Sequence, residues 1–240
     1  MTDAGVLVRM RGVIKDYRSL RPLRIRELDV RRGRSLSLLG FDEATAEVLV
    51  NLLTGGITPD EGEIEVFGEP TAAIRDRDRW IAMLDRFGLV SERAVLLEQL
   101  TAEQNLAIPW TLAVESMSDA IRADVRTLAE EVGITGDELT ASVSRLPPAV
   151  RLRIRLGRAL ALRPDVVLAE HPNAALPQHD GLAFARDFRR IARRRGLATI
   201  VMTADPTFAR AAADQVLVLQ PATGELQRPS AWSRWRFLFC

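Results

Sequence analysis

Cysteine, lysine and tyrosine each occur once in this chain of 240 residues, as Cys240, Lys15 and Tyr17. A single cysteine excludes an internal disulfide framework. The sequence also lacks a secretory signal pattern and an apolar run long enough to cross a bilayer, so we expect a cytoplasmic protein whose membrane contact is indirect. Acids and bases nearly balance, at a formal net charge of +1, so no overall field directs the chain toward nucleic acid or anionic lipid.

Hydrophobic residues make up 47% of the sequence, which is enough to bury a sizeable core in one large α/β domain or two small ones. Apolar and polar residues alternate over 6–17 and 23–33, and this alternation predicts half-exposed strands that form an antiparallel edge. The run SLSLLG at 35–40 predicts a buried strand. Apolar residues at helical spacing follow it over 46–56 and end at a glycine pair, which predicts a helix.

Helices alternate with apolar strands in the second half, and this predicts a mainly parallel sheet covered on both faces. The runs SLSLL, DVVLA and TIVM should be neighbouring central strands of that sheet. The elements expected after residue 56 are a strand within 58–68, a mostly helical insertion at 75–145, helices at 150–164 and 181–195, and strands at 165–170, 197–205 and 213–220.

Several stretches, taken in order, resemble the nucleotide-binding subunit of ATP-binding cassette (ABC) transporters, and the resemblance runs from residue 6 to residue 226. The stretch LLTGGITPDEGEIEVFGEP is similar to the segment after the family's phosphate loop, and GRALALRPDVVLAEHPNAAL to its signature helix and magnesium-binding strand. DRFGLV and LLEQLTAEQNLAIP are similar to its glutamine-loop region. LTAEQNLAIP is closest to the subgroup that powers Mla/Mce-type lipid transporters.

The resemblance implies an α/β, P-loop NTPase-like (ABC ATPase) fold, with a mostly parallel central sheet, an antiparallel β edge and a helical subdomain. It implies a cassette-like domain over residues 1–228, with a helical lobe at 95–145 inserted in it. Residues 229–240 then form a separate aromatic tail.

The loop that would hold phosphate departs from the family pattern. That pattern is glycine, two variable residues, glycine, a variable residue, glycine, lysine, then serine or threonine twice, whereas residues 40–48 read GFDEATAEV. Only Gly40 matches, Ala46 stands at the lysine position, and Glu47 follows it. A carboxylate about 4 Å from a phosphate charge is unfavourable by about 4 kcal/mol at an effective dielectric of about 20. We interpret the loop as a solvated strand-to-helix turn, with Asp42 or Glu43 near the helix N-terminus.

The other aligned positions also differ from the family. Glu92 stands at the glutamine that senses magnesium and the permease, and Glu170 stands at the metal-binding aspartate. His171 aligns with the catalytic glutamate and Ala204 with the switch histidine. His171 and His179 are the only histidines, and no cluster of cysteines or histidines surrounds them, so we expect no metal site.

The signature segment is altered as well. In the family this segment caps the γ-phosphate of the opposing subunit through serine and glycine N–H groups at a helix N-terminus. Two prolines at this place remove two backbone donors. The aligned residues are Leu146, Pro147, Pro148, Ala149 and Val150.

Three further features each have more than one interpretation. Tyr17 falls where the family stacks an aromatic ring on adenine, or it closes a strand end. The run RRIARRRG at 189–196 is either a nucleic-acid patch or, as we favour, the solvated face of an amphipathic helix. The tail contains Trp232, Trp235, Phe237 and Phe239, and it docks on a partner, on the bilayer surface or on its own domain.

The leading hypothesis is a non-catalytic (pseudo-ATPase) subunit of a membrane transport complex with a structural or regulatory role. No cofactor is expected under this hypothesis. The expected partners are a membrane permease, bound through residues 92–110 at the inner face of the membrane, and a second cassette subunit, the same or different. One alternative is an active but atypical ATPase, with Glu47 and Glu170 holding magnesium for ATP and His171 acting as base. Another is a free-standing cytoplasmic adaptor.

Overall fold

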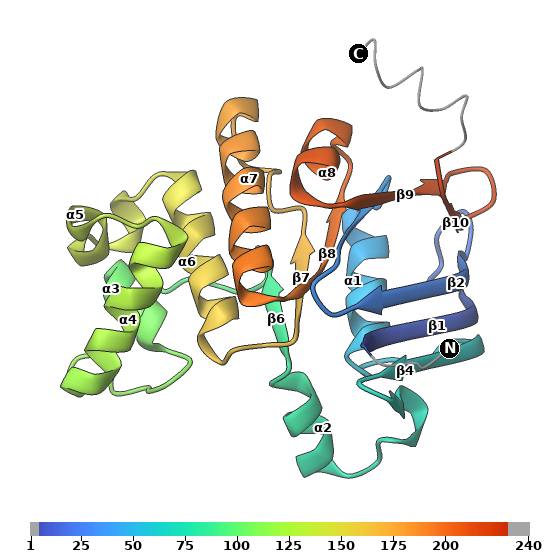
Figure 1. Ribbon diagram of the computed structural model, residues 1–240, viewed down its shortest axis with the longest axis horizontal. Coiled ribbons are helices and arrows are strands. Elements are labelled where there is room, and N and C mark those ends of the chain that lie inside the picture. Colours follow the sequence, from blue (N-terminus) through green and yellow to red (C-terminus); the bar gives the residue numbers. More distant parts are fainter. Residues whose placement is uncertain (1–4, 230–240) are drawn as a thin grey trace.

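The computed structural model describes residues 5–229, which form a ten-stranded mixed sheet with helices on both faces (Figure 1). The strands lie in the order β5-β4-β1-β2-β10-β9-β3-β8-β7-β6. Blue antiparallel strands occupy one end of the molecule in Figure 1, and the green and yellow helices gather at the other end. The predicted aromatic tail at 230–240 lies outside the described residues.

The antiparallel half of the sheet begins with the two alternating segments. β1 (Val6–Lys15) pairs with β2 (Leu23–Arg31) in antiparallel register, with Met10 opposite Leu28. β4 (Glu61–Val66) pairs with the other side of β1, and β5 (Glu69–Pro70) ends the sheet. The predicted antiparallel pairing is therefore confirmed, although β1 and β2 themselves lie inside the sheet.

The parallel half contains the three runs predicted to be central. β3 (Ser35–Leu39) lies between β9 (Gln215–Gln220) and β8 (Ala198–Thr203), and β7 (Val166–Glu170) lies beyond β8. Every residue of β3, β7 and β8 is buried, which explains why their sequences are continuous apolar runs. The prediction that these strands are parallel neighbours is confirmed. The short β10 (Glu225–Gln227) joins this half to β2.

One predicted helical stretch contains a strand. β6 (Phe87–Val90) pairs in parallel with β7 and forms the edge of the sheet, so the expectation of mostly helix over 75–145 is wrong at this point. The strand is short and includes Gly88, whose packing against Ala159 of the helical side leaves little room for a side chain. Arg93, three residues after the end of this strand, belongs to the site described below.

The helices cover both faces of the sheet. α1 (Glu43–Leu53) and α2 (Arg77–Leu84) lie on the side of the first core, which includes Leu49 and Met83. The second core contains Val125, Leu156 and Phe188 from three helices. The remaining helical elements are α3 (Ala102–Ala107), α4 (Asp119–Val132), α5 (Gly136–Thr140), α6 (Pro148–Ala161), α7 (Gln178–Arg195), α8 (Pro206–Ala212) and the 3-10 turns η1 (Thr71–Ala73) and η2 (Val143–Arg145).

The helical elements between 95 and 145 pack on α6 and α7 within this second core. The division into a domain at 1–228 and a lobe at 95–145 stays a prediction. None of the helices within residues 5–229 is long and apolar enough to span a membrane.

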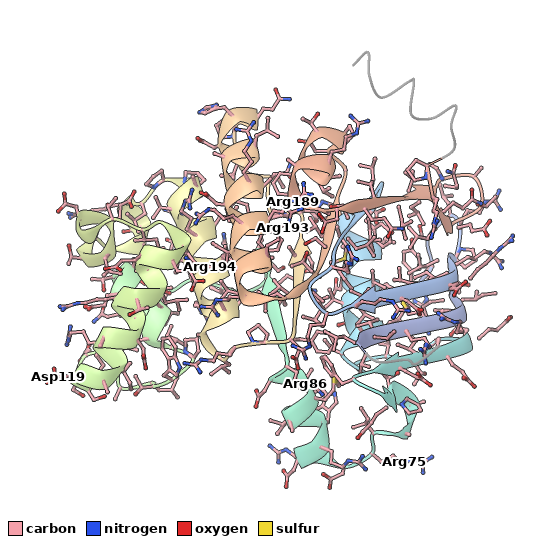
Figure 2. All side chains as sticks on the ribbon, viewed as in Figure 1. Arg75, Arg86, Asp119, Arg189, Arg193 and Arg194 are labelled. Carbon is pink, nitrogen blue, oxygen red and sulfur yellow. The ribbon has the colours of Figure 1, made fainter. Side chains whose placement is uncertain are left out.

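Arginines of α7 bind acids on both sides of this helix. Arg189 and Arg193 contact Asp214, whereas Arg194 lies at the side of α7 nearest α4 and contacts Glu131 at 2.7 Å (Figure 2). Each arginine of the basic run at 189–196 has such an ion pair within the chain. This pairing supports our interpretation of the run as the face of an amphipathic helix, on which the side chains of Arg190, Arg193 and Arg194 remain 59%, 59% and 58% exposed.

Glu131 joins three helices through these contacts. Arg195 donates to Glu131 through Nε at 2.9 Å and also through Nη2, and its Nη1 donates to the Leu160 carbonyl of α6 at 2.9 Å. The Arg195 hydrogen bonds lower the pKa of Glu131 below its ordinary value of 4.5, assisted by Arg194 and opposed by burial. The side chain of Glu131 is only 10% exposed, so solvent screens these charges weakly.

We predict that Glu131→Gln lowers the free energy of unfolding by about 1.5 to 3 kcal/mol at pH 7. Because the folded pKa of Glu131 lies below the unfolded one, its stabilisation is complete above the unfolded pKa and is lost as pH falls through the folded pKa. The deficit of the variant should therefore shrink as pH falls below 4.5, as urea unfolding at several pH values would measure. Glu130→Gln, on the exposed neighbour, is the control and should change little. A deficit independent of pH would contradict the assignment.

Candidate functional site

The loop between β3 and α1 is short because α1 begins early. Gly40 leaves the strand at a φ of 88°, a value that favours glycine, and its N–H donates to the Thr203 carbonyl at 3.0 Å. Phe41 turns into the core and is 1% exposed. Asp42 is the N-cap, and α1 starts at Glu43. The stretch that aligns with the phosphate loop is therefore mostly helix, with only Gly40–Asp42 left as loop.

Asp42 supplies the anion at the N-terminus of α1. Its Oδ1 accepts from the Thr45 N–H at 2.8 Å and from the Thr45 hydroxyl at 2.6 Å. The hydroxyl bond is the larger cause and the N–H bond the second cause of a lowered pKa of Asp42, so the carboxyl group is ionised at neutral pH. The end of a helix that attracts anions thus already has one from its own chain. The prediction that Asp42 or Glu43 lies at this helix N-terminus is confirmed for Asp42.

The lysine position points into the protein. Ala46 is 1% exposed and belongs to the core under α1. Tyr17 approaches from the end of β1, and its hydroxyl lies 2.7 Å from the Thr45 hydroxyl. The structure thus joins Tyr17, Asp42 and Thr45 in one hydrogen-bonded group at the start of α1. The predicted stacking of Tyr17 on adenine stays a prediction.

A cation that sequence analysis did not identify lies beside this loop. Arg93 follows β6, and its Nη1 contacts Glu47 Oε1 at 3.0 Å. Its Nε lies 3.1 Å from Glu170 Oε2, and its Nη2 donates to Glu170 Oε1. Because α1, β7 and the loop after β6 meet at the carboxyl ends of parallel strands, the topology brings these residues together.

Electrostatics reinforce this group, which we call the Arg93 triad (Glu47, Arg93 and Glu170). The hydrogen bond with Glu170 is the main cause that raises the pKa of Arg93, and the charges of Glu170 and Glu47 add to it. Glu170 is 7% exposed, so its charge requires a partner. The oxygens proposed to hold magnesium in the active-ATPase alternative thus already accept from a guanidinium. With Arg93 in place, the donor set does not fit a magnesium ion. Potential metal clusters of three or more His, Cys, Asp or Glu are also absent from residues 5–229.

Glu92 faces away from the triad. Its two carboxylate oxygens accept from Arg155 of α6, at 2.8 Å from Nη1 and 2.6 Å from Nη2. This bidentate pair joins the segment after β6 to the helical side of the molecule. Consecutive residues, Glu92 and Arg93, therefore bind opposite neighbours.

The positions aligned with the base and the switch lie on adjacent loops. His171 follows β7 with a φ of 44°, and its Nε2 is buried with no hydrogen-bond partner in the described part of the chain. Ala204 is exposed after β8. Asn173 links these loops, since it accepts from the Thr203 hydroxyl at 3.0 Å and donates to Asp205 at 3.1 Å. Exposed His179 contacts Asp180 and takes no part in the site.

The signature-aligned segment leads into the first turn of α6, and no side chain caps the N-terminus of this helix. Pro147 is the N-cap, Pro148 is the first helical residue, and the Val150 N–H donates back to the Pro147 carbonyl at 3.0 Å. Leu146 and Val150 are each 6% exposed, while Ala149 adds no polar group. The first turn of α6 therefore presents few free donors to an opposing ligand.

The strand order and the loop positions define an α/β protein of the P-loop NTPase class. The family model described as ABC transporter matches residues 23–174, which is more than half of the chain. The chain therefore belongs to the ABC transporter family.

Two curated relatives illustrate this membership. The phosphonates import ATP-binding protein PhnC of Anaeromyxobacter dehalogenans is 31% identical, over 95% of this chain and 46% of its own length. The lipoprotein-releasing system ATP-binding protein LolD 2 of Caulobacter vibrioides is 29% identical, over 95% of this chain and 92% of its own length. The chain thus spans about half the length of the first relative and most of the second.

Solved structures share the fold. cbiO1 from Clostridium perfringens, described as part of the ABC transporter complex cbiONQ, superposes with a TM-score of 0.80 at 17% identity, over 98% of this chain and 94% of that chain. The bacterial ABC transporter cassette MJ0796, solved as a dimer, superposes with a TM-score of 0.75 at 22% identity, over 92% and 97%. These likenesses confirm the predicted ABC ATPase fold.

We predict that Asp42→Ala destabilises the protein by about 0.5 to 2 kcal/mol, because the Thr45 N–H and hydroxyl lose their acceptor. Glu43→Ala is the matched control, since Glu43 is exposed in the same helical turn and should contribute only a few tenths of a kcal/mol. Denaturant unfolding at neutral pH measures both. Equal losses in the two variants would show that Asp42 acts only through its general negative charge.

Proposed function

We propose that this ABC transporter family member is a non-catalytic subunit that acts as a structural or regulatory component of a transport complex. The observation that carries the proposal is the start of α1, where Asp42 takes the place of a bound anion and Ala46 is buried at the lysine position. A triphosphate would meet a carboxylate where the family presents glycine N–H groups. The proline-rich start of α6 supports the same conclusion for the opposing half of a nucleotide site.

The proposal does not name a single cargo or a single transporter subgroup. Curated relatives include proteins named for lipoprotein release, phosphonate import and methionine import. The placement near Mla/Mce-type lipid transporters stays a prediction beside these names. The docking of the aromatic tail on a partner also stays a prediction, because residues 230–240 lie outside the described residues.

We propose that the permease contact lies within residues 92–110, at the inner face of the membrane. Val95 and Leu97 are 67% and 49% exposed, which is unusual for apolar side chains held by an ordered backbone. Arg158 fixes the Val95 carbonyl at 2.7 Å, and Asn105 binds both backbone groups of Leu97 at 2.9 Å. The segment therefore presents apolar side chains on a fixed support. That a permease binds here rests on family analogy.

We predict no saturable binding of ATP at millimolar concentration with magnesium, as measured by calorimetry on the full chain. Repulsion by Asp42 and the missing lysine both disfavour the phosphates. A micromolar dissociation constant would contradict the proposal and favour the atypical ATPase.

Ala46→Lys serves as the companion variant in that experiment. A lysine there should not restore ATP turnover, because the buried position also places its ammonium group in an apolar core. The same variant should unfold at lower temperature than the natural protein. Robust hydrolysis by this single variant would show that the loop retains more function than we propose.

We predict that Val95→Glu or Leu97→Glu reduces the recovery of the membrane partner at least tenfold when the complex is purified in detergent with its native partners. A carboxylate placed in an apolar contact costs about 2 kcal/mol or more, which exceeds a tenfold change in affinity. Leu20→Glu is the matched control, since Leu20 is 96% exposed outside the proposed contact. Unchanged recovery in both test variants would exclude this surface. Absence of any membrane partner with the natural protein would favour the adaptor hypothesis.

A further inference from the structure

The sheet has a gap between β2 and β9. β10 lies between these two strands (Figure 1), but it pairs with β2 at one register position only, Glu225 opposite Arg24. Its pairs with β9 end at Val218. Within the described part of the chain, residues 25–31 of β2 and 215–217 of β9 therefore have no strand partner on the side that faces the gap. The backbone N–H and C=O groups of such an edge can pair with another strand.

A groove of about 600 Å³ occupies this gap, a size that is common among ligand-binding clefts. Leu28, Leu36 and Leu217 line it and belong to the first core. The groove lies at the amino ends of β3 and β9. The Asp42 loop and the Arg93 triad lie at the carboxyl ends of the parallel strands, so the groove is separate from the candidate site.

The acidic side chains that line the groove already have arginine partners from outside it. These acids are Glu27, Asp29 and Asp214. Arg11 contacts Asp29 at 2.7 Å and Glu27 at 3.3 Å. Asp214 binds two arginines of α7, Arg189 at 2.5 Å and Arg193 at 2.7 Å. The negative charges of the lining are therefore neutralised by neighbouring cations.

Two arginines of the lining have no such partner. Arg34 comes from the turn between β2 and β3, and Arg228 follows β10. Both side chains are exposed, and neither has an ion pair or a hydrogen bond within residues 5–229. A third lining arginine, Arg31, approaches Asp29 only to 3.9 Å. The uncompensated charge at the groove is therefore positive, and it favours an anionic ligand.

We propose that this groove binds an extended acidic segment of a partner protein, which adds to the sheet as a strand in line with β10. A polypeptide strand supplies the N–H and C=O groups that pair with both flanking edges, whereas nucleic acid or a small anion does not. Carboxylates of the segment then meet Arg34 and Arg228. The chain's own residues 230–240 are a poorer match in charge, because they contain Arg234 and Arg236 and no acidic side chain. This inference does not rest on the proposed function.

The test titrates the natural full chain with an acetylated and amidated peptide of four Glu-Val repeats, followed by calorimetry at low salt without nucleotide. We expect saturable binding with a dissociation constant below about 1 mM, weakened by added salt. A peptide of four Lys-Val repeats should not bind. Citrate should bind at least tenfold more weakly than the acidic peptide, because it offers charge without a backbone to pair. N-methylation of alternate peptide residues should likewise weaken binding at least tenfold.

Two double variants locate the contact. Arg34→Ala combined with Arg228→Ala removes two exposed charges and should weaken peptide binding about tenfold. The matched control combines Arg75→Ala with Arg77→Ala, which removes the same charge from exposed positions by α2, away from β10 (Figure 2). This control should leave binding unchanged. In hydrogen exchange, the bound peptide should slow the exchange of amides within 25–31 and 215–217.

Failure of the acidic peptide to bind at about 1 mM would overturn the inference. Equal losses in the two double variants, or equal affinity for citrate, would overturn it as well. Protection of residues 87–90 in place of β2 and β9 would show that the peptide binds only the outer edge of the sheet. A chain shortened to residue 229 that binds the peptide at least tenfold more tightly would assign the groove to the chain's own tail and exclude a partner segment. ATP binding by the natural protein would contradict the proposed function and leave the peptide result intact.

Discussion

Neutralisation of charge by the chain's own side chains at the carboxyl edge of the parallel strands is the constraint on which the site depends. Asp42 supplies an anion to the N-terminus of α1, and Arg93 supplies a cation to Glu47 and Glu170. Each group satisfies a demand that the fold creates, namely the donors at a helix start and a carboxylate at the end of a buried strand. Within the described residues, side chains of the chain itself therefore meet both of these demands.

The ion pairs at this edge also connect the sheet to the helical side of the molecule. Glu92 holds Arg155 of α6, while the next residue, Arg93, holds α1 and β7. The apolar residues Val95 and Leu97 follow directly, on a backbone tied down by hydrogen bonds. The ion pairs of Glu92 and Arg93 thus position the backbone that carries these two apolar residues.

The sequence alone predicts the parts of this structure that depend on local patterns. Burial on both faces of a strand favours a continuous apolar run, so the sequence predicts the strands at 35–39, 166–170 and 198–203. Asp42 is predictable because N-caps act on the adjacent turn. The strand at 87–90 is missed because it is short and contains a glycine. Arg93 is missed because its partner Glu170 lies 77 residues further along the chain, and only the sheet topology joins them.

The most direct test is hydrogen exchange at residues 40–53 and 87–93, with and without millimolar magnesium-ATP. It measures whether nucleotide changes the part of the site that Asp42 and Arg93 hold together. We expect equal exchange rates in both conditions, because Asp42 and Arg93 already occupy the anionic and cationic positions. Slower exchange of the α1 N-terminal amides on addition of magnesium-ATP, at a concentration that saturates the change, would contradict it. Such a result would mean that nucleotide displaces Asp42 from the start of the helix.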